Sequence, residues 1–173
     1  MSMGKKIFFC AACIVGLGSF AFFYPLRILS LTLDDRIVLF RVIKAGDTFR
    51  LGYLHSIALS DVWDTFTVGE DYQIVLTETR FQGQGAGLPS TPSAGETWHR
   101  DGRGFRISGM DRIVPFISWR VQKKWHGRFQ FGIEPEIDFS SRLGDGLVRI
   151  GVQQITGWQW LGLALRKRGS EFF

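Results

Sequence analysis

Two β-strands joined by a polar turn are predicted by residues 49–68, which read FRLGYLHSIALSDVWDTFTV. Side chains alternate along residues 49–54 and again along residues 62–67, which is the period of two expected for strands with one buried face. The polar residues at and beside the turn are His55, Ser56, Ser60, Asp61 and Asp64. They form the densest polar group in the chain, although their chemistry alone does not specify a reaction.

Further strand-like segments lie on both sides of this pair. They cover residues 37–43, 72–80, 96–98, 105–108, 112–121, 128–133 and 147–155. Turn signals for three hairpins lie at residues 44–47, 69–71 and 101–102. The first hairpin would join residues 37–43 to residues 48–55. No long helical period occurs before residue 157, and the 21 glycines favour tight turns. The sequence therefore predicts a mainly β fold, a single antiparallel β-sandwich or partly open barrel preceded by one N-terminal transmembrane helix.

The length of 173 residues allows one ordinary domain with terminal segments. We divide the chain into an N-terminal membrane anchor or signal segment, a periplasmic β-domain and an amphipathic basic tail. The bounds of these parts are residues 1–31, 32–156 and 157–173.

The N-terminal segment predicts the compartment. Ile7–Tyr24 is an uncharged run of 18 residues preceded by Lys5 and Lys6. A helix of this length spans ~27 Å, and the lysines are expected to stay in the cytoplasm. We expect a single-pass protein of the bacterial inner membrane with its main domain in the periplasm. Two alternatives stay open: a signal peptide cleaved after Ser19-Phe20-Ala21, and lipid attachment at Cys13, which too few apolar residues precede.

The formal net charge of +5 does not indicate a nucleic-acid-binding protein. Six of the 21 basic residues lie beside the apolar run or near the C-terminus, so 15 remain against 16 acidic residues. A basic face that follows phosphates is therefore not predicted. Both cysteines lie inside the apolar run, and the three histidines lack the spacing of a zinc site. We expect neither a metal ion nor another cofactor.

A glycine-rich loop with Gly83, Gly85, Gly87 and Leu88 has its glycines at every second position. Glycine permits positive φ, and successive backbone N–H groups in such a loop can bind a carboxylate or a phosphate. The alternative is a tight turn through which one strand crosses to a second sheet. If His55 and Arg80 converge on this loop, the site would be a small-anion pocket.

His55 has three readings: a hydrogen-bonding strand end, a ligand or partner contact, and a general base. We do not expect Ser56 to be its partner in catalysis, because adjacent strand residues point to opposite faces.

The C-terminal tail pairs aromatic and basic residues that suit a membrane interface. These residues are Trp158, Trp160, Arg166, Lys167 and Arg168. The alternative is a last strand that closes the core and is followed by a solvated end.

Three motifs resemble a bacterial family called domain of unknown function 1850. They are Tyr53-Leu54-His55-Ser56, Val62 with Asp64, and Glu78-Thr79-Arg80-Phe81 leading into Gly85-Ala86-Gly87-Leu88-Pro89. The resemblance covers roughly Leu33–Ile155. The chain departs from the family at Ile57-Ala58-Leu59, which is usually more polar, and at Asp64, where Glu is common.

Members of that family are typically encoded beside TAXI-type TRAP transporters, so the resemblance implies an accessory or regulatory role in solute uptake. The implied partners are the permease subunits or the solute-binding protein, together with the lipid bilayer. The implied contact residues are His55, Ser56, Asp64, Glu78, Arg80, Gly83, Gly85, Gly87 and Leu88. A periplasmic small-anion-binding or sensing module is the second hypothesis. A hydrolase-like enzyme using His55 and Asp64 is the third, and we expect a protein that is not an enzyme.

Overall fold

The computed structural model describes residues 22–82, 91, 93–102 and 104–168. This part of the chain is mainly β and forms two antiparallel sheets, which confirms the predicted fold class at that level. Neither of these two sheets closes into a barrel. The predicted anchor Ile7–Tyr24 lies almost wholly in residues 1–21, outside the described residues. Within the described ranges, no helix has the length and apolar character needed to cross a bilayer.

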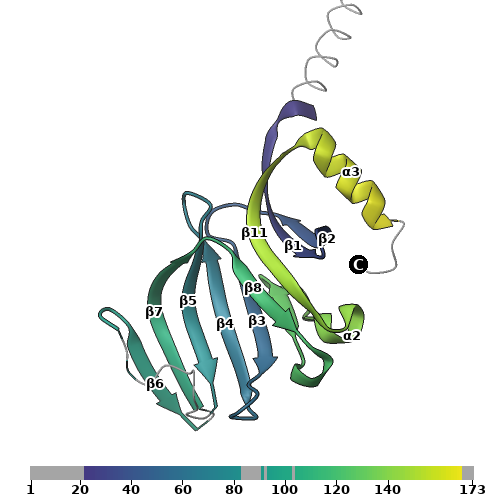
Figure 1. The fold of residues 1–173 in the computed structure, drawn as a ribbon. Coiled ribbons are helices and arrows are strands. Elements are labelled where there is room, and N and C mark those ends of the chain that lie inside the picture. Colours follow the sequence, from purple (N-terminus) through teal and green to yellow (C-terminus); the bar gives the residue numbers. More distant parts are fainter. Residues whose placement is uncertain (1–21, 83–90, 92, 103, 169–173) are drawn as a thin grey trace, which may run out of the picture. The chain divides into compact units, whose positions relative to one another are not determined.

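The smaller sheet contains four strands in the order β2-β1-β11-β8 (Figure 1). Their bounds are β1 Pro25–Leu33, β2 Arg36–Val42, β8 Ile117–Val121 and β11 Gly146–Thr156. The larger sheet contains seven strands in the order β10-β9-β3-β4-β5-β7-β6. Their bounds are β3 Thr48–Leu54, β4 Asp61–Val68, β5 Ile74–Phe81, β6 Thr97–Asp101, β7 Gly104–Val114, β9 Arg128–Phe131 and β10 Ile137–Asp138.

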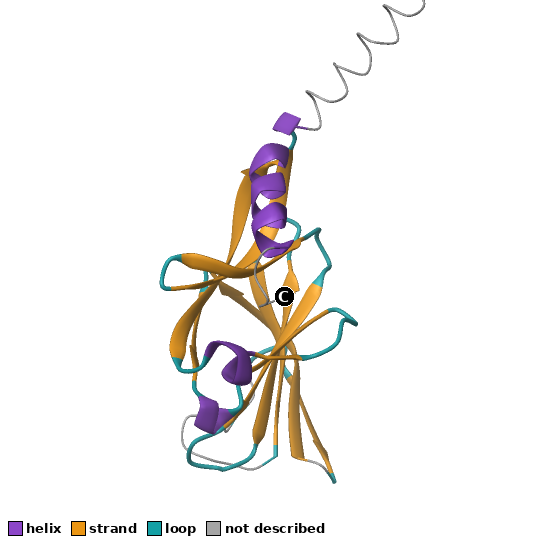
Figure 2. Ribbon diagram, turned by 90° about the vertical axis from the view of Figure 1, so that its right-hand side faces the viewer, coloured by secondary structure: helices purple, strands orange, loops and turns teal. Residues whose placement is uncertain are grey.

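Strands dominate the described chain in Figure 2, and helices are few. Besides the helical residues Phe22 and Phe23, the described helical elements are the 3-10 turn η1 Lys123–Trp125 and the helices α2 Phe139–Leu143 and α3 Gly157–Arg168. Asp138 caps α2, because its carboxylate accepts hydrogen bonds from both the backbone N–H and the hydroxyl of Ser141.

The predicted hairpin between residues 37–43 and 48–55 is wrong, because β2 and β3 belong to different sheets. The turn itself forms, and the backbone N–H of Asp47 donates to the carbonyl of Lys44 over 3.2 Å. Gly46 and Asp47 then exchange hydrogen bonds with Val68, which directs the chain onto β4 instead of back onto β2. The two hairpins β4–β5 and β6–β7 form as predicted.

The predicted single strand over residues 112–121 is divided between the two sheets. β7 ends at Val114 and pairs with β5, whereas β8 begins at Ile117 and pairs with β11. Pro115 lies at the break, where its missing N–H would interrupt a sheet ladder. Residues between β7 and β8 therefore carry the chain from the larger sheet to the smaller one.

Aromatic contacts connect the two sheets. Trp119 of β8 packs on Phe139 of α2 at a ring distance of 5.6 Å, and Phe139 packs on Phe129 of β9 at 5.8 Å. Phe129 in turn lies 6.1 Å from Phe49 of β3. Phe49, Phe129 and Phe139 are fully buried, so this row of rings lies in the hydrophobic core.

A second cluster covers the same face of the larger sheet farther along β4, β5 and β7. Its buried members are Val62, Phe81, Ile107 and Met110, and its partly buried members are Tyr53, Leu76, Trp98 and Phe105. We call the face that carries these clusters the inner face, and the opposite face of the larger sheet the outer face. Alternation along each strand then places the residues on either side of Val62, Phe81 and Phe105 on the outer face.

The chain divides into two compact units. One contains residues 29–152, with most of both sheets, and the other contains the described residues 22–28 and 153–168. In the second unit the N–H of Gly157 donates to the carbonyl of Tyr24, and α3 follows directly. The alternative reading of this segment as a last strand is therefore wrong, because the segment is helical.

Candidate binding site on the outer face of the larger sheet

The structure places the predicted contact residues in separate locations. Glu78 and Arg80 lie on the outer face of β5, Asp64 lies on the inner face of β4, and His55 and Ser56 lie in the β3–β4 loop. Gly83, Gly85, Gly87 and Leu88 fall outside the described residues. Of the predicted set, Glu78 and Arg80 are therefore the two that the structure brings together.

His55 organises the β3–β4 loop. Its Nδ1 accepts hydrogen bonds from the backbone N–H groups of Ile57 and Ala58 at 3.3 and 3.1 Å. Its own backbone closes the loop, because its N–H donates to Ser60 and its carbonyl accepts from Leu59. These bonds match the first reading of His55, a hydrogen-bonding strand end.

Asp64 is a carboxyl group enclosed on the inner face. Thr79 Oγ1 donates to Asp64 Oδ1 over 2.8 Å, and the Tyr53 hydroxyl is its second donor. Burial raises the pKa of Asp64, and these two hydrogen bonds offset part of the rise. The pKa of Tyr53 is also raised, first by burial and then by the nearby Asp64 carboxyl. The group faces the core and does not line the cavity described next.

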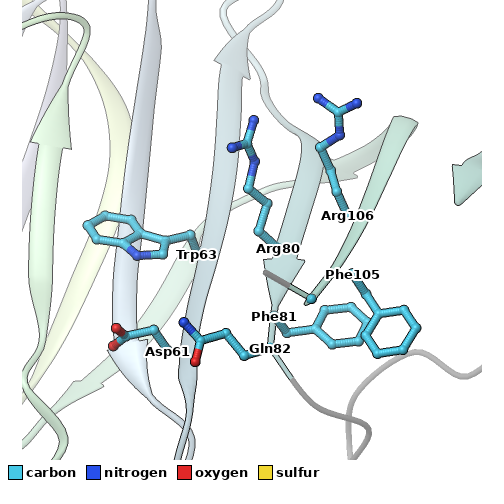
Figure 3. A pocket seen from close by; sticks show the side chains of 8 residues that line it. Asp61, Trp63, Arg80, Phe81, Gln82, Phe105 and Arg106 are labelled. Atoms are coloured by element: carbon cyan, nitrogen blue, oxygen red, sulfur yellow. The ribbon is translucent and has the colours of Figure 1, made fainter. Parts of the chain in front are cut away.

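A cavity of about 490 Å³ lies on the outer face, across three neighbouring strands (Figure 3). Figure 1 shows these strands, β4, β5 and β7, side by side in the larger sheet. The lining residues are Asp61, Trp63, Arg80, Phe81, Gln82, Gly104, Phe105 and Arg106. We call this space the outer-face cavity. The side chains of Phe81 and Phe105 stack together in the inner cluster, so these residues form its floor.

Sheet register arranges the other six lining residues in two rows. Trp63 pairs with Arg80, and Arg80 pairs with Arg106, so these three residues form the first row across β4, β5 and β7. A step of two residues along each strand, in the same register, leads from the first row to the second. The second row consists of Asp61, Gln82 and Gly104. A strand period of two directs both rows to the same face.

Trp63 is held in place by its cross-strand neighbours. Gly52 is its partner on β3, and a Cβ on Gly52 would meet the indole carbons at 2.7 Å, so the ring lies against the glycine backbone. The guanidinium groups of Arg50 and Arg128 stand 5.4 and 4.7 Å from the ring centre. These cation–π contacts orient the indole at one end of the cavity.

Arg80 and Arg106 are the cationic groups of the first row. Both side chains extend in the same direction in Figure 3. Arg80 Nε lies 2.5 Å from Glu78 Oε1, and Arg106 Nη1 lies 4.0 Å from Glu78 Oε2. One carboxylate is therefore shared by two guanidinium groups, which leaves one positive charge of this trio uncompensated. Arg80 and Arg106 are 54% and 42% exposed, so they remain open to a ligand.

Gly104 leaves space in the second row. A Cβ at this position would stand 2.4 Å from the carbonyl oxygen of Phe81, and its φ of +135° is one that L side chains rarely adopt. Gln82 supplies an amide beside it, with both a donor and an acceptor group. Asp61 ends the row with a carboxylate, which Arg128 Nη2 contacts at 2.6 Å.

This arrangement suits the binding of an anion. A pair of guanidinium groups can form bidentate hydrogen bonds with a carboxylate or phosphate, and the indole offers an apolar surface beside them. Among the lining residues there is no serine, cysteine or histidine nucleophile. The described residues also contain no group of three His, Cys, Asp or Glu side chains that could hold a metal ion.

Arg80 is the one lining residue that belongs to the predicted contact set. The lining residues that were not predicted as site residues are Asp61, Trp63, Phe81, Gln82, Gly104, Phe105 and Arg106. A signal for them exists in the sequence, because non-aliphatic residues at 61, 63, 80, 82, 104 and 106 flank the apolar positions 62, 81 and 105. The pairing of β5 with β7 carries no such signal, since residues 97–101 of β6 lie between them in the chain.

The predicted membrane-interface residues lie in α3. Trp158 and Trp160 are 50% and 38% exposed, and Arg166 is also exposed. The side chains of Lys167 and Arg168 are outside what the structure describes. An interface role for α3 stays a prediction.

Comparison with known proteins extends this description. No curated protein and no solved structure matches the chain at a significant level. One family model does match, over a shorter range than the predicted resemblance of Leu33–Ile155. Residues 49–134, which include every residue that lines the outer-face cavity, match the family described as Domain of unknown function (DUF1850).

Proposed function

We propose that this protein is a non-catalytic binding module for a small anion, and that it serves as an accessory or regulatory component of a TAXI-type TRAP solute transporter. The observation that carries the binding function is the pair Arg80 and Arg106. They are cross-strand partners on β5 and β7, line the same cavity and share Glu78. Uncompensated positive charge in a concave site attracts an anion.

The chemistry of the cavity fits a carboxylate with an attached apolar portion. The carboxylate would lie between the two guanidinium groups, where charge-assisted hydrogen bonds are strongest. The apolar portion would contact the indole of Trp63, which Arg50 and Arg128 hold in a fixed orientation. A volume of about 490 Å³ lies within the range of ~300–1,000 Å³ typical of small-ligand pockets.

The transport role rests on the motif resemblance and on the match of residues 49–134 to the DUF1850 family. In this role, an anchor in the inner membrane would hold the domain in the periplasm beside the permease subunits or the solute-binding protein. Anion binding would then control how strongly the domain contacts these partners. The hydrolase alternative gains no support, because Asp64 lies on the inner face while His55 holds a loop.

Calorimetry on the full-length, detergent-solubilised protein tests anion binding. The probe is heptanoate, and the matched neutral compound is heptanamide. We expect heptanoate to bind and heptanamide not to bind, because only the carboxylate can pair with the guanidinium groups. Arg80→Gln and Arg106→Gln should each weaken heptanoate binding by about tenfold, the effect of losing one charge-assisted hydrogen bond.

The control variant is Arg112→Gln. Arg112 also lies on β7 and is 46% exposed, but it pairs with Glu96 and does not line the cavity. It should therefore keep wild-type affinity for heptanoate. Equal affinity for heptanoate and heptanamide, or an equal loss in all three arginine variants, would rule out the proposed site.

The transport role has a separate test. Co-purification of the full-length protein from its native membrane, with and without Arg80→Gln, should recover TRAP permease subunits or the solute-binding protein. A recovered complex that contains neither would contradict the transport role and leave the anion site unaffected.

A further inference from the structure

The two rows of the outer-face cavity differ in charge. The first row carries Arg80 and Arg106, and the second row begins with the carboxylate of Asp61. In Figure 3, Asp61 and Gln82 lie beside each other, away from the ends of both arginine side chains. A site for a simple anion needs positive charge alone, so the acidic end of this cavity requires a reason of its own.

The charge of Asp61 is only partly compensated. Arg128 Nη2 lies 2.6 Å from Asp61 Oδ1, but Arg128 Nε also lies 3.6 Å from Glu136 Oε1. Two carboxylates therefore share one guanidinium group, which leaves one negative charge of this trio uncompensated. Asp61 is 44% exposed, and a carboxylate has acceptor positions for more than one donor.

The opposite end has the reverse balance. There, two guanidinium groups share the single carboxylate of Glu78. Arg50 adds positive charge at this end of the cavity. It is the cross-strand partner of Thr65, and Thr65 is the partner of Glu78, so Arg50 lies in the row of residues next to the row that contains Trp63. The cavity thus has an excess of positive charge at one end and of negative charge at the other.

Resting on the proposed function, we propose that the ligand of this cavity is a zwitterion, with its carboxylate on Arg80 and Arg106 and an ammonium group on Asp61 and Gln82. The sheet sets the spacing of the two charged ends. Asp61 and Arg80 occupy diagonal positions on adjacent strands, and the Cα atoms of such neighbours are roughly 7–8 Å apart. An amino acid whose two charged groups are separated by several carbon atoms spans this distance. The unlike ends also reject a dicarboxylate, because its second carboxylate would face Asp61.

Three probes of equal length separate the possibilities in calorimetry on the full-length protein. They are 6-aminohexanoate, heptanoate and pimelate, in which the end opposite the first carboxylate is an ammonium, a methyl and a carboxylate group. We expect 6-aminohexanoate to bind about tenfold more tightly than heptanoate, the value of one charge-assisted hydrogen bond. Pimelate should be the weakest ligand.

Asp61→Asn should abolish the advantage of 6-aminohexanoate over heptanoate, because it removes the carboxylate that would pair with the ammonium group. Glu136→Gln removes an acid that does not line the cavity, and by freeing Arg128 to pair with Asp61 it should reduce the same advantage by about threefold. Asp71→Asn, in the exposed β4–β5 turn at the other end of these strands, is the matched control and should change neither affinity.

The outcomes distinguish this inference from the proposed function. If heptanoate and pimelate bind at least as tightly as 6-aminohexanoate, and both depend on Arg80, the zwitterion is excluded while the anion site stands. If none of the three probes binds, or if their binding does not depend on Arg80 and Arg106, the proposed function itself is wrong. An advantage of 6-aminohexanoate that survives Asp61→Asn also overturns the inference.

Discussion

The indole ring of Trp63 lies on the backbone of Gly52, its partner across β3 and β4, with no room for a side chain between them. A Cβ on Gly52 would stand 2.7 Å from the ring atoms Cη2 and Cζ2. The glycine therefore allows the ring to lie close to the sheet, between Arg50 and Arg128. The shape of one end of the outer-face cavity depends on this contact.

We expect Gly52→Ala to displace Trp63, because the new methyl group overlaps the ring. Overpacking of this kind costs about 1–3 kcal/mol in the free energy of unfolding. Heptanoate affinity should also fall, since the apolar wall of the cavity moves. Gly151→Ala is the control, because a Cβ there meets nothing within 4 Å. Thermal unfolding and calorimetry on both variants provide the measurement, and equal tolerance of the two changes would contradict the described contact.

Asp64 makes stability depend on pH. Burial raises its pKa, so the folded protein holds this proton to a higher pH than the unfolded chain does. Its contribution to the free energy of unfolding is therefore complete below about pH 3.9, the ordinary aspartate pKa, and is lost as the pH rises through the folded-state pKa. We expect Asp64→Asn to become progressively more stable relative to wild type over this interval.

Urea unfolding of wild type and Asp64→Asn at a series of pH values measures this difference. Asp71→Asn, at an exposed position, is measured in parallel as a comparison. A difference between wild type and Asp64→Asn that does not change with pH would show that the Asp64 carboxyl titrates alike in the folded and unfolded states.

Thr79 satisfies the buried carboxyl of Asp64 with a bond of 2.8 Å, and it is only 5% exposed. Thr79→Val keeps the shape but removes the donor, so we expect a loss of about 1–3 kcal/mol at neutral pH. Thr77→Val, which removes a bond of 3.2 Å to the carbonyl of Thr65, should cost less. In a double-mutant cycle, Thr79→Val should cost less when Asp64 is already Asn, and strict additivity would refute the coupling.

His55 is expected to act on the β3–β4 loop through Nδ1. His55→Ala removes an acceptor for two backbone N–H groups and should lower stability by about 1 kcal/mol. His55→Asn places an amide oxygen near the same position and should restore part of the loss. If both variants keep wild-type stability yet lose partner proteins in co-purification, His55 is a contact residue rather than a structural one.

The N-terminal segment predicts that a periplasm-dependent reporter fused to the C-terminus will be active. The intact mass of the purified protein should include Ile7–Tyr24. A mass lower by about the first 21 residues would instead indicate a cleaved signal peptide.

The sequence by itself determined the β class of the described chain and two of its three predicted hairpins. These features depend on short-range chemistry: side-chain alternation with a period of two, and turn residues such as Asp101-Gly102. Family-specific motifs also pointed to the region that the DUF1850 model matches.

The tertiary structure decided which strands are neighbours. The β2–β3 hairpin failed because Gly46 and Asp47 bond to Val68, and β7 reached β5 because β6 pairs on the far side of β7. Arg106 therefore lies beside Arg80, 26 positions away in the chain, and Asp64 faces the core although Trp63 faces the cavity. Local sequence patterns specify the face of a strand, whereas long-range pairing is set by packing of the whole core, so the cavity and its two charged ends emerge only in the folded sheet.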